Sequence, residues 1–145
     1  MRSSNSINSS ESPPLRWIAK IYVHCSATPN DRDIGFKEID RMHKLRGWKG
    51  CGYHKIIRRD GSIENGRPEK EIGAHVEGHN LDSLGVCLIG LDQFTETQFS
   101  SLFSLLKQWM TQYHIPKSNV FCHYESDLKG KTCPNLSADW IRSQL

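Results

Sequence analysis

Three side chains that suit metal chemistry lie close together near the end of the chain. The segment His123-Tyr-Glu-Ser-Asp-Leu-Lys-Gly-Lys131-Thr-Cys133-Pro holds an imidazole, an ammonium and a thiol. Cys133 follows His123 by ten positions, which is too far for a zinc-finger ligand pair but suits two of the three ligands of a catalytic zinc site. His24, at the end of the apolar run 18–23, is a candidate third ligand. The chain has seven histidines, so a set of purely structural residues stays open as the alternative.

Further side chains could act on a carbonyl group held at such a site. Lys131 offers an ammonium and Tyr53 a phenol, and either group can stabilise negative charge on the oxygen. A solvated surface lysine and an ordinary strand aromatic are the alternatives. His54 must point to the opposite face of its strand from Tyr53, which favours a structural role. His75, in a glycine-rich loop, either contacts substrate, orients a ligand or is a surface histidine.

The hydrophobic pattern predicts an α/β domain that places these candidates near strand ends. We expect strands at 17–24, 53–59, 62–65, 83–89 and 120–123. We expect helices at 35–46, at 95–113 and after residue 137, capped by Asp33, by Thr95 with Gln98, and by Ser137. Strands that alternate with helices indicate a single mixed central sheet flanked by helices.

Composition narrows the class of protein further. A chain of 145 residues suits one domain, and we expect a flexible polar tail at 1–14 followed by a domain at 15–145. The net charge of +3 is small and scattered, so nucleic acid is not expected as a partner. Neither the tail nor the charge predicts an oligomer, so we expect a monomer. Five cysteines without a CxxC pair are typical of a reducing compartment.

No export or membrane signal is recognisable in the sequence. No apolar run approaches the roughly 20 residues of a membrane span, and the first 14 residues lack the apolar core of a signal peptide. We therefore expect synthesis in the cytoplasm, with another release route if the protein acts outside the cell.

Five separated segments carry a resemblance to a known family. They follow one another as Ile21-Tyr-Val-His24-Cys-Ser-Ala-Thr28, Gly52-Tyr53-His-Lys-Ile-Ile-Arg-Arg-Asp60-Gly61, Ile72-Gly-Ala-His75-Val-Glu-Gly78-His-Asn80, Ser83-Leu-Gly-Val-Cys-Leu-Ile-Gly90 and Lys131-Thr-Cys133-Pro134. Together they resemble the zinc-dependent N-acetylmuramoyl-L-alanine amidases of the phage-lysozyme type. That family shares its fold with peptidoglycan recognition proteins. The segments 90–95 and 125–130 depart from the family pattern.

The resemblance implies both a reaction and roles for residues. His24, His123 and Cys133 match the Zn²⁺ ligands, Tyr53 matches the active-site tyrosine, and Lys131 matches the catalytic lysine. The implied reaction hydrolyses the amide between N-acetylmuramic acid and L-alanine in peptidoglycan or muropeptides, as an endolysin does on the cell wall. The alternative is a non-catalytic peptidoglycan-binding module. Such relatives typically lack the zinc cysteine, so Cys133 favours the enzyme.

Overall fold

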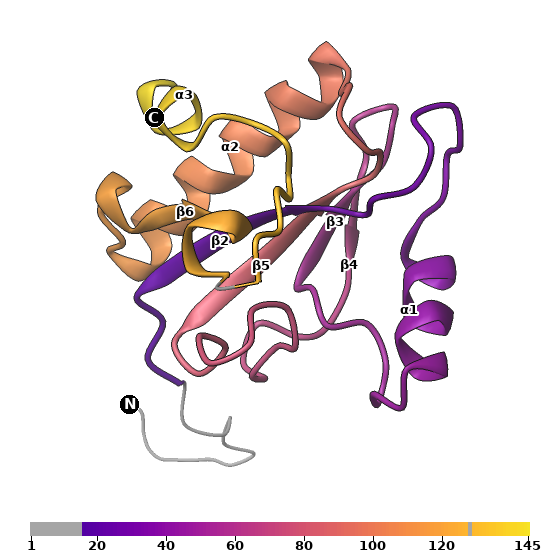
Figure 1. The fold of residues 1–145 in the computed structure, drawn as a ribbon. Coiled ribbons are helices and arrows are strands. Elements are labelled where there is room, and N and C mark those ends of the chain that lie inside the picture. Colours follow the sequence, from indigo (N-terminus) through magenta and orange to yellow (C-terminus); the bar gives the residue numbers. More distant parts are fainter. Residues whose placement is uncertain (1–15, 128) are drawn as a thin grey trace.

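In the part of the chain that the structure describes, a five-stranded mixed sheet forms the centre. The computed structural model describes residues 16–127 and 129–145, so the predicted tail at 1–14 lies outside the described residues. The strand order is β4-β3-β5-β2-β6 (Figure 1). Three of the four pairings, β3 with β5, β5 with β2 and β2 with β6, are parallel, and β4 is antiparallel to β3. The strands are β2 (Lys20–Cys25), β3 (Lys55–Ile57), β4 (Ile63–Asn65), β5 (Ser83–Leu88) and β6 (Val120–Cys122).

Helices pack against both faces of this sheet. The helices are α1 (Phe36–Leu45), α2 (Glu96–Tyr113) and α3 (Ala138–Ser143), with short 3-10 turns at η1 (Lys117–Asn119) and η2 (His123–Ser126). Figure 1 shows α1 on one side of the sheet and α2 with α3 on the other. The larger core lies under α2 and α3, and the smaller core lies under α1. The α1 side is therefore only partly covered by a helix.

Side-chain alternation along β2 decides which residues face which core. Ile21 and Val23 are fully buried in the larger core. Successive residues of a strand point to opposite faces, so Tyr22 and His24 face the α1 side. Tyr22 stacks on Phe121 at 5.4 Å between ring centroids. The candidate ligand His24 thus lies on the face that loops, rather than α2 and α3, cover.

The helix α2 shows how local signals and burial act together. Thr95 and Gln98 form the predicted capping box, with the backbone N–H of Gln98 donating to Thr95 Oγ1 at 3.0 Å. Leu102, Leu106 and Trp109 are almost completely buried against the sheet. Each such side chain contributes about 1.5–3 kcal/mol relative to exposure, so this face anchors the helix.

The predicted fold class is confirmed, and the differences are local. The strand expected at 17–24 begins only at Lys20, and the one expected at 53–59 is reduced to β3. Asp33 does not cap α1; the N-cap is Gly35. The reason is a long-range contact, because the Asp33 carboxylate pairs with Arg58 at 3.1 Å. No described helix combines the length and the hydrophobicity needed to cross a bilayer.

Candidate metal centre and active site

The parallel pairing of β2 with β6 brings the two distant histidines together. Val23 is opposite Cys122 in the register, so the next residues, His24 and His123, emerge side by side. Their ring centroids are 4.6 Å apart. Both side chains leave the sheet at the carboxyl end of a parallel strand, where binding sites of open α/β sheets collect.

Cys133 completes the cluster from the loop that follows η2. The backbone N–H of Cys25 donates to Cys133 Sγ at 3.1 Å, and the carbonyl of Cys133 accepts from the N–H of Tyr124 at 3.0 Å. One ligand atom from each of His24, His123 and Cys133 lies within 4.8 Å of the other two. A single ion could therefore contact all three, with a fourth position left open. A backbone N–H aimed at sulfur also suits a thiolate ligand.

The protonation states of the cluster fit a zinc ion. Burial, reinforced by the neighbouring His75 and His123, lowers the pKa of His24 well below its ordinary value. Burial also lowers the pKa of His123, and the charge of Lys131 adds to the effect. Both imidazoles are thus neutral, as metal ligands must be. The thiol of Cys25 and burial raise the pKa of the Cys133 thiol, and a bound cation reverses that preference because it deprotonates the thiol it coordinates.

His75 is buried and touches a candidate ligand. Only 8% of it is exposed, and its Nδ1 lies 2.9 Å from Nε2 of His24. Asn80 Oδ1 accepts from the backbone N–H of both His75 and Val76, which fixes the loop. A Cβ at position 85 would lie 2.7 Å from the His75 ring, so Gly85 makes room for it. The surface alternative for His75 is wrong.

Tyr53 faces the cluster, and His54 faces away from it. The ring of Tyr53 lies 5.0 Å from that of His24. Burial and neighbouring thiols raise the pKa of Tyr53 well above its ordinary value, so the phenol keeps its proton. His54 Nδ1 accepts from the backbone N–H of Gly85 at 3.0 Å. This agrees with the structural role expected for His54.

His43 is a supporting residue that the sequence did not single out. Its Nδ1 accepts from the backbone N–H of Gly52 at 2.9 Å, and its ring lies 5.3 Å from that of Tyr53. Trp48 packs edge-on against the same imidazole at 4.7 Å. His43 therefore helps to fix the position of Tyr53. The only sequence signal was its place on the apolar face of α1.

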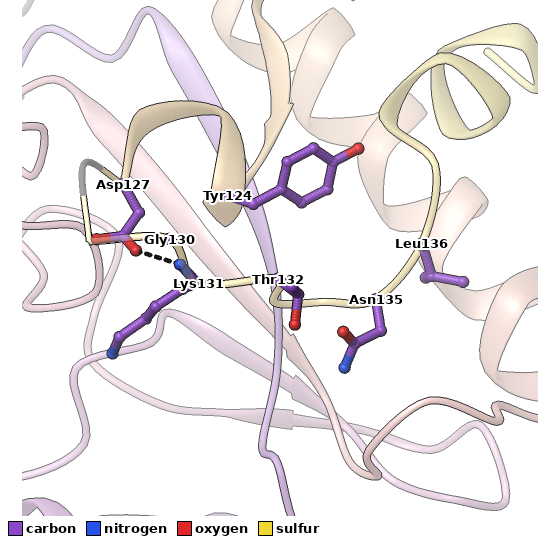
Figure 2. A pocket seen from close by; sticks show the side chains of 7 residues that line it. All are labelled: Tyr124, Asp127, Gly130, Lys131, Thr132, Asn135 and Leu136. Atoms are coloured by element: carbon purple, nitrogen blue, oxygen red, sulfur yellow. Dashed lines mark hydrogen bonds between the residues drawn. The ribbon is translucent and has the colours of Figure 1, made fainter.

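Lys131 lies between two cavities. Its backbone N–H donates to Asp127 Oδ2 at 2.8 Å, which orders the loop before Cys133 (Figure 2). A groove of about 950 Å³ is lined by residues 74–80 and, from the C-terminal part of the chain, by His123, Asp127 and Lys131 among others. A smaller pocket of about 330 Å³ shares Asp127 and Lys131 with it. Figure 2 shows Tyr124, Thr132, Asn135 and Leu136 around this smaller pocket.

Comparison with known proteins decides the family. A family model described as N-acetylmuramoyl-L-alanine amidase matches residues 14–136. The chain belongs to this amidase family. Among curated relatives, the amidase is 40% identical to the endolysin of Enterobacteria phage K11 over 134 residues, covering 86% of each chain. It is 40% identical to the endolysin of Escherichia phage T7 over 135 residues, covering 86% of this chain and 87% of the relative.

Solved structures agree with this assignment. The N-acetylmuramoyl-L-alanine amidase LysC from Clostridium intestinale URNW superposes on the amidase with a TM-score of 0.80 at 31% identity, covering 94% of this chain and 93% of that one. Peptidoglycan recognition protein-LE, solved in complex with tracheal cytotoxin, gives a TM-score of 0.74 at 25% identity, covering 92% and 84%. The predicted family, fold and enzyme class are confirmed. The protein is a peptidoglycan hydrolase, an N-acetylmuramoyl-L-alanine amidase.

Proposed function

We propose that the amidase is a zinc enzyme whose metal ligands are His24, His123 and Cys133. The observation that carries the proposal is the His-His-Cys cluster, with its ligand atoms within 4.8 Å of one another beside the large groove. Two imidazoles and one thiolate with an open fourth position are typical of catalytic zinc. Zinc in such a site polarises a carbonyl group and lowers the pKa of water from about 15.7 to about 7.

The other side chains of the site have roles that follow from their charge and position. The ammonium of Lys131 stabilises the negative charge that develops on the carbonyl oxygen of the scissile amide. Tyr53 remains a phenol because of its raised pKa, so it donates a hydrogen bond that orients the substrate or the attacking water. His75 holds His24 through the 2.9 Å contact.

The two cavities suit the two halves of the substrate. The large groove is lined by polar and charged side chains such as Glu77 and His79, which suit an extended stem peptide. The smaller pocket combines the ring of Tyr124 and the side chain of Leu136 with the polar groups of Thr132 and Asn135, which suits an N-acetylated sugar. Lys131 lines both cavities. The amide bond that joins the sugar to the peptide would therefore lie beside this lysine.

The relatives also support a proposal for the setting of the reaction. Several curated relatives are endolysins, and we infer that this amidase likewise acts on the cell wall after release from the cell that makes it. We also propose that it acts as a monomer, because one chain supplies all three ligands and both cavities.

Mass spectrometry of muropeptides tests bond and metal together. Digestion of purified peptidoglycan should release stem peptides that begin at L-alanine, and a chelator should abolish the release until zinc is restored. Binding to peptidoglycan without any peptide release would instead favour the non-catalytic module. Release that continues after complete metal removal would overturn the zinc proposal while leaving the amidase activity intact.

Lys131→Ala tests the role of the ammonium. Losing one donor to a developing oxyanion typically costs about 100- to 1,000-fold in turnover, so this variant should bind zinc normally and lose most activity. Lys107→Ala is the matched control, because it also removes one exposed lysine but from α2, and it should cleave like the wild type. A Lys131→Ala variant with wild-type turnover refutes this role.

A further inference from the structure

A chain of hydrogen bonds runs from the candidate metal ligand into the sheet. His24 Nε2 lies 2.9 Å from His75 Nδ1, and His75 Nε2 lies 3.3 Å from Ser83 Oγ. Ser83 Oγ in turn donates to the backbone carbonyl of His79 at 2.7 Å. His24, His75 and Ser83 are 1%, 8% and 0% exposed. All three side chains are therefore removed from bulk water, so their hydrogen bonds must be made with one another and with neighbouring backbone groups.

The backbone carbonyl of His79 is the last acceptor, and it fixes the donor and acceptor of every hydrogen bond in this series. A carbonyl oxygen only accepts, so the single hydroxyl proton of Ser83 points to His79. Ser83 Oγ can then only accept from His75, which places a proton on His75 Nε2. Metal binding at Nδ1 of His24 requires its Nε2 to carry the proton, and His75 Nδ1 must accept that proton. One arrangement satisfies all three contacts, and it leaves a free lone pair on Nδ1 of His24.

A histidine is an ambiguous partner for a metal ligand, which is why a further residue matters. A carboxylate or a carbonyl always accepts from the ligand's second nitrogen. An imidazole accepts at Nδ1 in one tautomer only, and in the other tautomer it would donate a proton to Nε2 of His24. Something must therefore select the tautomer of His75.

Other neighbours of His75 are already engaged. The ring of His54 is 5.8 Å away between centroids, but its Nδ1 accepts from Gly85 N–H and its Nε2 faces the carbonyl of Glu71. Among the hydrogen bonds of the described residues, Ser83 is the partner of His75 Nε2.

We propose that Ser83 is a positioning residue for the metal centre. Anchored on the carbonyl of His79, its hydroxyl selects the tautomer of His75, and His75 then presents Nδ1 of His24 to the ion shared with His123 and Cys133. This proposal rests on the proposed zinc function. Groups that hold a metal-ligating histidine typically change metal affinity by about 10- to 100-fold when removed.

Zinc affinity, measured by competition with a chelator of known affinity, tests the proposal without any substrate. Ser83→Ala should bind zinc about 10-fold more weakly, the lower end of that range, because Ser83 acts through His75. The pair Ser83→Thr and Ser83→Val separates hydroxyl from shape, since the two side chains are nearly isosteric. Ser83→Thr should bind zinc about 10-fold more tightly than Ser83→Val. Cobalt-substituted Ser83→Val should also show an altered visible absorption spectrum.

A serine outside the site supplies the control. Ser101 on α2 also donates its hydroxyl to a backbone carbonyl, that of Gly61, so Ser101→Ala should leave zinc affinity unchanged. Equal zinc affinity and equal cobalt spectra for Ser83→Thr and Ser83→Val would overturn the inference, even if Ser83→Ala failed to fold. A wild-type protein that binds no zinc would overturn the proposed function itself.

Discussion

Because His54 is buried, we expect the free energy of unfolding to fall in acid by an amount that depends on this residue. Its Nδ1 accepts from Gly85 N–H at 3.0 Å, its Nε2 donates to the carbonyl of Glu71 at 2.9 Å, and the guanidinium of Arg16 lies 3.2 Å from Nε2. Burial lowers the pKa of His54 to about 4, with a smaller contribution from the charge of Arg16. The hydrogen bond to the carbonyl of Glu71 acts in the opposite direction and raises the pKa.

The sign follows from comparing the folded and unfolded chains. The unfolded chain takes up a proton at His54 near pH 6.5, whereas the folded protein does so only near pH 4. The stability linked to His54 is therefore complete above about pH 6.5 and is lost as the pH falls towards 4. At 1.36 kcal/mol per pH unit of difference between the two pKa values, the free energy of unfolding should fall by about 3 kcal/mol. Total stabilities are typically about 5–15 kcal/mol.

Urea unfolding of metal-free protein between pH 7 and pH 4, followed by tryptophan fluorescence, measures this loss. In His54→Asn the amide oxygen can still accept from Gly85 N–H, but the side chain does not titrate. The variant should be less stable at pH 7, yet it should lose about 3 kcal/mol less than the wild type by pH 4. His114→Asn is the matched control, because His114 is exposed at the end of α2 with a left-handed φ of 56° that asparagine tolerates. Equal losses in wild type and His54→Asn would refute this reasoning.

Three further predictions concern the active site. Cys133→Ala should fold but lose stoichiometric zinc, as measured by metal analysis after gel filtration; retention of one zinc per chain would remove Cys133 from the ligand set. Tyr53→Phe should keep its zinc and lose about 10-fold in kcat, the effect of one hydrogen bond of about 1.4 kcal/mol, with unchanged kcat counting against a direct role. Gly85→Ala places a Cβ 2.7 Å from the His75 ring. Thermal unfolding should show a loss of stability of about 1–3 kcal/mol, and zinc should bind more weakly. Wild-type stability and zinc affinity would show that the loop moves to accept the Cβ without cost.

Local signals in the sequence predicted local structure well. The capping box at Thr95 and Gln98 marks the start of α2 correctly, because both of its hydrogen bonds lie within four residues. The cap expected at Asp33 is wrong because its carboxylate is held by Arg58, 25 positions away. Propensity carries no information about such a distant competitor.

In the candidate site, too, local features could be predicted from the sequence and long-range contacts could not. His24 and His123 were recognisable as strand-end residues, and the parallel register of β2 with β6 joins them. The contact of His75 with His24 and Ser83 depends on the path of the loop at 73–80 over the sheet. That path depends on the hydrogen bond to Asn80 and on the space left by Gly85. No sequence pattern predicts either contact.

The pairing of β6 with β2 also determines when the proposed metal centre can form. About a hundred residues separate His24 from His123, and they build β3, β4, β5 and α2 before β6 can dock on β2. Contacts between such distant segments form late, because the intervening chain must first be ordered. During synthesis, the ribosome makes Cys133 after all the strands that the structure describes. A growing chain therefore carries only His24 of the three proposed ligands until β6 and the loop after η2 have been made, so metal binding by all three would require that the described strands have already paired.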